Sequence, residues 1–580
     1  MRSVITATLG VIVLSACGGQ SSGTATIPSA RTLAAAVAAP THALSANALR
    51  GTYVAAVDPS TQVDLLVQLN GRNLDQIDSL IAEQNTPGSP LYHHYLTPQE
   101  YGADFGPSAQ DYAQAIATLQ SQGLVVDEAM PNRRDIFVHG SAAAVESLID
   151  SPLDVREENG RQFFTNRYTE QLPAALHAYA ISGDTDYHQV HPFSVHTPQV
   201  KIGSGAGFGA HDIESVYDLT PIYSSATGSG VTIVDATEGL ATASDFATFQ
   251  SKFGLKATLL SFSAGRKSPV DTYGETTIDV EYMAAVAPDV TIDQVTASST
   301  SDSSFDKMYA YIVNNLSSVH IVSTSWGDCE AQYGSSFNID ESDFQQAYTE
   351  GQWWLSAGGD SGVDDCANGT KGVDFPGSSP YVVSVGGTSV TPASTDHGNF
   401  TGWSNEVVWD DTLGCSSVRS CNKEGGGAGG GGVSTRFTMP AFQQALRLHG
   451  AMREVPDVAL MASPCDAPDG DSLCDGGENG GYWQYFQGAW QNGWGGTSFA
   501  APEWGAFLTL VQQKYGSTPI TSPLVRLYAL AGTPGYDTYF HDVTAGCNTY
   551  DGVPGFCASS GYDDASGLGS FIGAPLQAAY

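Results

Sequence analysis

Three short runs of apolar and β-branched residues constrain the fold of this chain more strongly than any other feature. They are Val-Thr-Ile-Val at 231–234, His-Ile-Val-Ser at 320–323 and Tyr-Val-Val-Ser-Val at 381–385, and stretches with helical periodicity lie between them. Short, largely apolar runs are typical of buried parallel strands, which need crossover connections to join them. The sequence therefore predicts an α/β fold with a parallel sheet in the C-terminal part of the chain.

A second folded unit is expected before this sheet, at residues 51–190. The chain has 580 residues, 41% of them hydrophobic, which is too long for one ordinary domain and apolar enough to bury a substantial core. Strand patterns and helical patterns alternate in this region, with strands predicted at 63–69, 124–127 and 135–138 and helices at 73–83, 109–122 and 142–149. This order predicts a small α+β sandwich.

The charge balance excludes one large class of partners. Acidic residues outnumber basic ones 61 to 23, which gives a formal net charge of -38. Such a chain repels polyanions at neutral pH, so we expect no nucleic-acid partner. Only 14% of the residues are charged and 65 are glycines, a composition that suits a protein working outside the cell in acid, where many carboxylates are neutral.

The first residues resemble an export signal. Arg2 precedes an apolar run from Val4 to Leu14, which is too short to span a membrane. The run ends in Leu-Ser-Ala-Cys at residues 14–17, which resembles a bacterial lipobox, with a lipoprotein signal peptide at 1–16 and a lipid anchor on Cys17. The alternative is an ordinary secretory signal. A Ser/Ala/Thr-rich linker follows to residue 50, and we expect the protein to be exported, either free outside the cell or anchored at the envelope.

Apart from Cys17, eight cysteines lie between Cys329 and Cys557. An even number in an exported chain indicates disulfides, although eight cysteines allow 105 connectivities. Short spacings favour Cys415–Cys421, Cys465–Cys474 and Cys547–Cys557, which leaves Cys329 with Cys366. No pair has the close spacing of a structural zinc site.

A candidate nucleophile lies near the C-terminal end of the predicted α/β region. Residues 495–502 read Gly-Gly-Thr-Ser-Phe-Ala-Ala-Pro, so Ser498 would lie at the start of a helix, whose N-terminus favours developing negative charge. Two groups of serine peptidases share such a Gly-Thr-Ser-x-x-x-Pro run. The alternative is a helix that is simply capped by Thr or Ser.

A serine nucleophile needs a base, and the histidines of this region have no suitable motif. A subtilisin-like site would use a histidine, yet no His-Gly-Thr occurs at any of His211, His320, His397, His449 and His541. Residues 274–281 instead read Gly-Glu-Thr-Thr-Ile-Asp-Val-Glu. On a helix Glu275 and Asp279 share a face while Glu281 points elsewhere, and two neighbouring carboxylates separate their pKa values. The alternative is a solvated acidic helix face.

A third carboxylate, Asp360, follows the strand-like Trp-Leu-Ser-Ala at 354–357 in a glycine-rich turn. A protonated aspartic acid there could donate to the oxyanion of a tetrahedral intermediate, which requires acid pH. The alternative is an aspartate that bonds to the backbone of its own turn.

Together these motifs resemble the sedolisin (serine-carboxyl peptidase) family. The phrases Ser-Pro-Leu-Tyr-His-His-Tyr-Leu-Thr at 89–97 and Tyr-Gly-Ala-Asp-Phe-Gly at 101–106 resemble its activation propeptide, and Ser-Thr-Ser-Trp-Gly at 323–327 resembles a motif of its peptidase unit. The resemblance implies an activation propeptide at 51–190, a cleavable linker at 191–209 and a subtilisin-like catalytic domain at 210–580. It also implies that Ser498 is the nucleophile, Glu275 the general base and acid, Asp279 its orienting partner, and Asp360 an oxyanion donor. Asp235 is a weaker candidate for a supporting carboxylate, and Asp457 is as compatible with a structural role.

The C-terminal stretch resembles the calcium site of the same family. His-Asp-Val-Thr at 541–544 and Ser-Ser-Gly-Tyr-Asp-Asp-Ala-Ser-Gly-Leu-Gly at 559–569 supply the hard oxygen ligands that Ca²⁺ prefers. The resemblance implies one structural ion, with ligands Asp542, Val543, Ser559, Gly561 and Asp563. Without the resemblance, Asx-rich turns would be the preferred interpretation.

The function predicted from the sequence is that of an exported, acid-active serine-carboxyl endopeptidase that releases its own propeptide, acts on proteins or peptides and is monomeric. A tripeptidyl-peptidase of the same family is the main alternative. A subtilisin-like enzyme would tolerate loss of Glu275, and a non-catalytic surface lipoprotein would not be expected to keep all four candidate residues.

Overall fold

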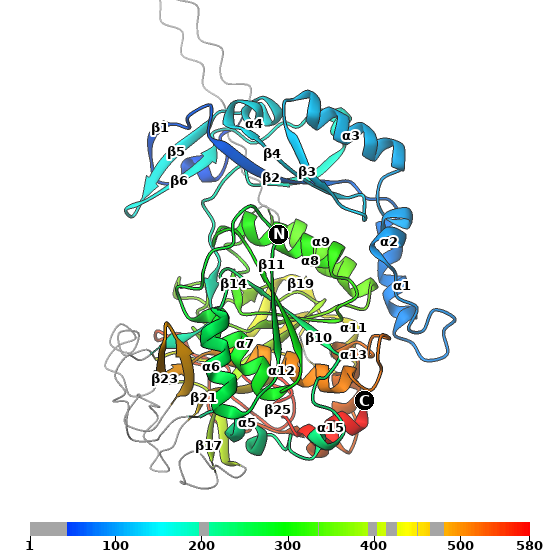
Figure 1. The fold of residues 1–580 in the computed structure, drawn as a ribbon, viewed down its shortest axis with the longest axis vertical. Coiled ribbons are helices and arrows are strands. Elements are labelled where there is room, and N and C mark those ends of the chain that lie inside the picture. The colour runs from blue at the N-terminus through cyan, green and yellow to red at the C-terminus, as the bar shows by residue number, and fades with distance from the viewer. Residues whose placement is uncertain are drawn as a thin grey trace, which may run out of the picture. The chain divides into compact units, whose positions relative to one another are not determined.

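The computed structural model describes residues 43–196, 208–334, 336–392, 403–412, 426–448, 450–464 and 481–580 (Figure 1). Residues 44–580 form one compact unit. The predicted signal peptide, Cys17 and most of the 17–50 linker lie outside the described residues, as do the cysteines at 415, 421, 465 and 474. Within the described residues, no helix is long and apolar enough to cross a membrane.

The N-terminal part, blue and cyan in Figure 1, is built on an antiparallel sheet in the order β3-β4-β2-β7. Its strands are β2 (Gln62–Leu69), β3 (Val125–Ala129), β4 (Asp135–Ser141) and β7 (Ala178–Ser182). A smaller sheet contains β1 (Thr52–Ala56), β5 (Leu153–Glu158) and β6 (Arg161–Asn166). The helices are α1 (Ile77–Gln84), α2 (Pro98–Asp104), α3 (Ala109–Ser121) and α4 (Ala142–Ile149). Leu65 of β2, Leu119 of α3 and Val145 of α4 share one buried core, and the predicted α+β fold is confirmed.

Local hydrogen bonds explain where these helices begin. The hydroxyls of Ser108 and Ser141 accept from the backbone N–H groups of Asp111 and Ala144, at 3.1 and 3.3 Å. Thr97 and Glu100 form a capping box at the start of α2. Such caps satisfy amides that have no partner inside the helix.

The C-terminal part is built on a larger sheet in the order β11-β12-β10-β13-β15-β17-β18, and β21 also pairs with β17. Its strands are β10 (Thr232–Thr237), β11 (Thr258–Ser263), β12 (Thr291–Thr296), β13 (Ile321–Thr324), β15 (Trp353–Ala357), β17 (Val382–Pro392), β18 (Trp403–Val408) and β21 (Val458–Pro464). The pairs are parallel except for β17 with β18. The three apolar runs correspond to β10, β13 and the first half of β17, so the predicted parallel sheet is confirmed.

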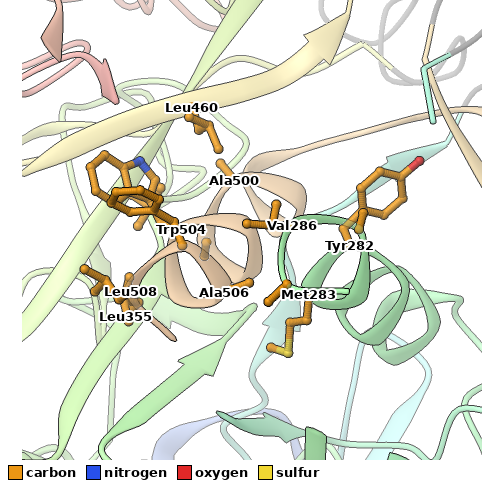
Figure 2. Packing of buried hydrophobic residues seen from close by; sticks show 14 of the residues in the cluster. Tyr282, Met283, Val286, Leu355, Leu460, Ala500, Trp504, Ala506 and Leu508 are labelled. Atoms are coloured by element: carbon orange, nitrogen blue, oxygen red, sulfur yellow. The ribbon is translucent and has the colours of Figure 1, made fainter. Parts of the chain in front are cut away.

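Two buried helices, α7 (Glu275–Val286) and α12 (Thr497–Gln512), pack against each other in this part (Figure 2). Met283 and Val286 of α7 lie beside the small side chains Ala500 and Ala506 of α12. Small residues at a helix contact allow the two backbones to approach closely. The packing therefore brings the helix that begins with Glu275 next to the helix that carries Ser498.

Other helices of the C-terminal part are α5 (Ala210–Val216), α6 (Ala243–Phe253), α8 (Asp302–Asn315), α9 (Phe337–Thr349), α11 (Ala441–Ala445), α13 (Pro523–Ala531), α14 (Tyr536–Tyr539) and α15 (Gly573–Ala579). The N-terminal part contacts α8 and α9. Gln84 Nε2 and the Leu96 amide both donate to the Thr349 carbonyl oxygen, at 2.9 and 3.0 Å, and Ser182 bonds to Asp306.

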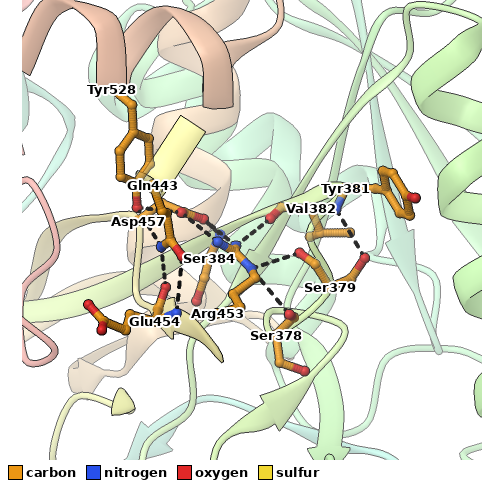
Figure 3. Close-up of polar contacts among 10 residues, drawn as sticks. All are labelled: Ser378, Ser379, Tyr381, Val382, Ser384, Gln443, Arg453, Glu454, Asp457 and Tyr528. Atoms are coloured by element: carbon orange, nitrogen blue, oxygen red, sulfur yellow. Dashed lines mark hydrogen bonds and ion pairs between the residues drawn. The ribbon is translucent and has the colours of Figure 1, made fainter. Parts of the chain in front are cut away.

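A buried ion pair fixes the entry to β21 (Figure 3). The Arg453 guanidinium donates to both oxygens of Asp457, at 3.0 and 2.6 Å, and to the carbonyls of Ser378, Ser379 and Val382. Asp457 also accepts from the Ser384 amide and the Tyr528 hydroxyl, each at 2.8 Å. Both charges are therefore compensated in the core, which supports the structural role considered for Asp457.

Two of the predicted disulfides, Cys329–Cys366 and Cys547–Cys557, are present. The sequence predicts an accessible linker at 191–209. In its first six residues the structure instead has two short strands that pair with the C-terminal part. His191–Pro192 form β8, which pairs with β14 (Trp326–Cys329), and Val195–His196 form β9, which pairs with β23 (Ala489–Gly495). Phe193 between them is 6% exposed, because both strands hold the segment against the C-terminal part.

Candidate active site

Three polar residues lie at the carboxyl ends of adjacent parallel strands. Asp235 is on β10, Ser325 directly follows β13, and Asp360 lies three residues beyond the end of β15. These strands are neighbours in the sheet. In open α/β sheets the crevice at this edge is where ligands bind.

The turn before α12 places Ser498 at the same edge. Gly496 has a φ of +123°, a conformation that favours glycine, and a Cβ there would lie 2.4 Å from the Phe193 carbonyl oxygen and 2.6 Å from Asp360 Oδ2. The amide of Ser498 donates to that same carbonyl oxygen at 3.0 Å. Position 496 therefore requires glycine, because any side chain there would collide with the Phe193 carbonyl oxygen and with Asp360.

Glu275 and Asp279 lie one turn apart on α7, and both are fully buried or nearly so, at 0% and 1% exposure. Burial raises the pKa of Glu275 well above its ordinary value, and the neighbouring Asp279 raises it further. The hydroxyls of Ser194 and Ser498 act in the opposite direction and lower the Glu275 pKa, which places Ser498 beside this carboxyl. Glu281 lies elsewhere, because its carboxylate accepts from the Tyr485 amide.

The Ser498 hydroxyl is close to Glu275 without meeting the geometry of a formed hydrogen bond. Ser498 Oγ and both Glu275 oxygens are buried and have no such bond within the described residues. Catalytic hydrogen bonds are often long before the reacting complex forms. Such a bond, once formed, could carry a proton from Ser498 to Glu275.

Asp235 is the partner of Asp279. Burial raises the pKa of both groups, and their side chains interact directly. Two ionised carboxylates this close would repel each other, so the arrangement favours a state in which one of them is protonated. The Ser325 hydroxyl donates to Asp279 Oδ1 at 2.8 Å and lowers the pKa of that carboxyl. Glu275, Asp279 and Asp235 thus form a row of carboxyl groups that begins at Ser498.

Asp360 is arranged to act as a neutral acid. Its Oδ1 accepts from the amide and the hydroxyl of Thr497, each at 2.8 Å. Its Oδ2 is buried without a hydrogen-bond partner in the described residues. Burial raises the Asp360 pKa well above its ordinary value, although the Thr497 bonds lower it. Because Oδ1 accepts two bonds, Oδ2 is the oxygen that could carry a proton when Asp360 is neutral.

Of the five histidines considered as a possible base, the three that the structure describes have other partners. His211 lies beside Glu214, His320 bonds to the Ser517 carbonyl, and His541 bonds to Glu406. His397 and His449 lie outside the described residues. The carboxyl that borders Ser498 is thus Glu275.

The sequence did not single out Asp271 or Ser325 as individual residues of the site. Asp271 accepts from the amides of Tyr273, Gly274 and Thr277 and from the Thr277 hydroxyl, and so fixes the start of α7. Asp271 lies three residues before the N-cap residue Gly274, so the usual N-cap pattern does not point to it in the sequence. Ser325 lies within the Ser-Thr-Ser-Trp-Gly motif, but only the fold shows that its hydroxyl reaches Asp279.

The residues predicted to bind calcium lie in two loops that contact each other. The Gly561 amide donates to both oxygens of Asp542 at 3.1 Å, and the Ser559 amide donates to Asp563 Oδ2 at 2.9 Å. The Tyr536 hydroxyl donates to Asp542 Oδ1 at 3.3 Å, and the charge of Asp563 also raises the pKa of Tyr536, so both carboxyls lie near this hydroxyl. Together with the carbonyl of buried Val543, the set offers only oxygen atoms and fits a hard cation such as Ca²⁺.

A separate group, Asp64, Asp127 and His139, could also hold a cation, since its ligand atoms lie within 4.8 Å of one another. Asp127 already pairs with His139 and Asp64 with Arg266, so these charges have partners.

Comparisons with known proteins match two parts of the chain separately. Residues 50–184 match "Pro-kumamolisin, activation domain", and residues 264–528 match "Subtilase family". Xanthomonalisin of Xanthomonas sp. (strain T-22) is 28% identical over 90% of this chain and 66% of its own length. Tripeptidyl-peptidase 1 of Canis lupus familiaris is 25% identical, over 89% of this chain and 91% of its own.

Sedolisin of Pseudomonas sp. (strain 101) is 25% identical over 89% of this chain and 86% of its own length. A solved structure of Pseudomonas sedolisin, described as a serine-carboxyl proteinase in complex with pseudo-iodotyrostatin, matches with a TM-score of 0.54 and 25% identity. The match covers 65% of this chain and 98% of that chain.

Proposed function

Because the chain belongs to the sedolisin family of serine-carboxyl peptidases, we propose that it is an acid-active endopeptidase whose triad is Ser498, Glu275 and Asp279. We further propose that residues 51–190 are its activation propeptide and residues 210–580 its catalytic domain. The propeptide inhibits the enzyme until the enzyme cuts itself.

Proton transfer begins at Glu275. In its ionised form Glu275 accepts the Ser498 proton as Oγ attacks the peptide carbonyl, and it later returns that proton to the leaving amine. Asp279 orients Glu275, and Asp235 and Ser325 hold Asp279. Since burial raises the pKa of Glu275 and Asp279, this base has a pKa above that of an ordinary carboxylate.

The oxyanion of the tetrahedral intermediate takes the place of the carbonyl oxygen that now accepts from the Ser498 amide. Asp360 Oδ2, when protonated, supplies a second donor there. An ionised Asp360 would instead repel the oxyanion. Activity therefore needs a protonated Asp360 and an ionised base at the same time. Both conditions are met only over a limited range of acid pH.

One observation favours an endopeptidase over a tripeptidyl-peptidase. A segment of the chain itself occupies the site, and the Phe193 carbonyl oxygen accepts from the Ser498 amide. Three residues before Phe193, the Val190 amide donates to the Thr300 carbonyl at 2.9 Å. A tripeptidyl-peptidase has to bind a free N-terminus at the third residue before the cut. Here the chain continues past that position and is still hydrogen-bonded to the C-terminal part.

The test is digestion of acid-denatured casein at acid pH, with products identified by mass spectrometry. We expect internal fragments of many lengths from wild type and none from Ser498→Ala. Release of successive tripeptides from the N-terminus would instead establish the tripeptidyl-peptidase.

We also propose one structural Ca²⁺, held by Asp542, Asp563 and the carbonyls of Val543, Ser559 and Gly561. A cation that binds only the folded protein stabilises it by mass action. Removing metal with a chelator should lower the Tm, and Asp563→Ala should remove the response to added Ca²⁺; a Tm unaffected by either would reject the site.

Export, with or without a lipid on Cys17, and a monomeric state remain part of the proposal. Mass spectrometry of the N-terminal peptide of the membrane fraction would detect the lipid. Gel filtration of the active enzyme measures the oligomeric state.

A further inference from the structure

Residues 190–196 of this chain cross the candidate active site as an extended segment. Before the site, β8 pairs antiparallel with β14, so that Pro192 lies opposite Trp326 and His191 opposite Gly327. Beyond it, β9 pairs antiparallel with β23, so that Val195 lies opposite Gly495. The segment is thus held by backbone pairing on both sides of the Phe193–Ser194 peptide bond, which fixes its register.

The backbone of Phe193 is bound at both of its polar groups. Its amide donates to the Ser325 carbonyl at 3.0 Å, and its carbonyl oxygen accepts from the Ser498 amide at 3.0 Å. A Cβ on Gly496 would lie 2.4 Å from that oxygen and 2.6 Å from Oδ2 of Asp360, so the two oxygens are at most 5.0 Å apart. Of the carbonyls in this segment, the Phe193 carbonyl is therefore the one presented to the nucleophile and the oxyanion donors.

The Phe193 side chain is buried as part of the large hydrophobic cluster of the C-terminal part, and we call the space that its ring occupies beside Gly327 its pocket. It is 6% exposed, and a Cβ on Gly327 would lie 2.9 Å from its ring. Any larger residue at 327 would thus reduce the space that the ring occupies. The fit favours a large apolar side chain on the acyl side of the cut bond.

On the other side of the bond, Ser194 faces the general base. Its hydroxyl lowers the pKa of Glu275, and its Cα lies 2.8 Å from the position of a Cβ on Gly496. The amine that would leave is therefore on the side of the site where Glu275 can return a proton.

We propose that Phe193–Ser194 is the bond that this enzyme cuts first in its own chain, and that the pocket at Gly327 selects it through the phenyl ring. This inference rests on the proposed function. Ser498 Oγ bonds to the Phe193 carbonyl carbon while its proton passes to Glu275. The bond to the Ser194 nitrogen then breaks as Glu275 protonates that amine, and water hydrolyses the ester to free the Phe193 carboxyl group and Ser498.

The experiment acidifies purified full-length precursor and follows early time points by intact mass and N-terminal sequencing. The first new N-terminus should be Ser194, and the rate should not depend on protein concentration, because the bond is cut within its own molecule. Phe193→Ala should slow this step at least about tenfold through loss of the ring from the pocket. Ile202→Ala, a matched loss of an apolar side chain in the same predicted linker, should leave the rate unchanged.

A synthetic peptide of residues 190–199, Val-His-Pro-Phe-Ser-Val-His-Thr-Pro-Gln, tests the same bond without requiring any precursor variant to fold. Mature enzyme should cut it between Phe and Ser, and replacement of Phe by Ala in the peptide should lower kcat/KM at least about tenfold.

The outcomes separate this inference from the proposed function. If wild type digests casein in a Ser498-dependent way, but its first cut lies elsewhere and Phe193→Ala matures at the wild-type rate, the inference is wrong and the function stands. If neither casein nor the precursor is cut in a Ser498-dependent way, the proposed function itself fails.

Discussion

At the scale of single residues, the candidate site consists of carboxyl groups whose protonation is set by their surroundings. Glu275, Asp279 and Asp235 are buried together, which favours their neutral forms. The Ser325 hydroxyl, which donates to Asp279, lowers the pKa of Asp279, and the Ser194 hydroxyl lowers the pKa of Glu275. The same residue types on a solvated helix face would have ordinary pKa values. Burial is what converts the acidic side chains into candidate bases and acids.

Asp360→Asn tests the donor side of the site. The amide oxygen of asparagine can accept from Thr497 as Asp360 Oδ1 does, and its NH₂ can donate where Oδ2 lies. Because this donor cannot lose its proton by ionising, the alkaline limb of kcat/KM against pH should move to higher pH, even if the maximum falls. An unmoved alkaline limb would assign that limb to another group.

Ser325→Ala tests the base side. Removing the hydroxyl that donates to Asp279 Oδ1 takes away a bond that favours the ionised form. The pKa of the coupled carboxyls should rise, so the acid limb of kcat/KM should move to higher pH. Ser323→Ala is the matched control, since the Ser323 hydroxyl is buried without a partner among the described residues; an equal shift in both variants would contradict the assignment.

At the scale of elements, the predictions held where a pattern is local. Periodicity and apolar runs predict the helix at 275–286 and the parallel strands β10, β13 and β15. Ser498 lies in the first turn of α12, which directly follows two glycines, as its motif predicts. The contact between α7 and α12 depends on packing that no local pattern encodes. For the same reason the Asp279–Asp235 pair and the insertion of Phe193 could not be derived, because they join residues far apart in the sequence.

The connection into β21 provides a prediction at this scale. Arg453→Ala should destabilise the protein by about 3–5 kcal/mol, because Asp457 would remain buried without its cation. Urea denaturation at constant pH measures the change. Lys252→Ala, which removes an exposed cation in the last turn of α6, should stay within about 0.5 kcal/mol of wild type; equal losses in both variants would contradict the role of the pair.

At the scale of the whole molecule, buried carboxyl groups extend well beyond the site. Asp302, Asp306 and Asp340 form a cluster whose burial raises each pKa, and burial raises the pKa of Asp184 to about 7. The ordinary aspartate pKa is 3.8. At pH values between 3.8 and about 7, the folded protein therefore binds more protons at these groups than the unfolded chain does.

The free energy of unfolding should accordingly fall as pH rises from about 4 to about 7, opposite to acid denaturation. Asp184 alone would contribute up to about 4 kcal/mol of this loss. Chemical denaturation of the inactive Ser498→Ala precursor across that range measures it without self-digestion, and Asp184→Asn should flatten the slope. A stability that rises over the same range would contradict the prediction.

The central claim is that Glu275, and not a histidine, is the base for Ser498. The most direct measurement is kcat/KM on one peptide from about pH 2 to about pH 9, for wild type and Glu275→Gln. We expect a bell-shaped profile with an acidic optimum for wild type and no measurable turnover for Glu275→Gln at any pH. A wild-type optimum at or above neutrality, or an active Glu275→Gln enzyme, would contradict it.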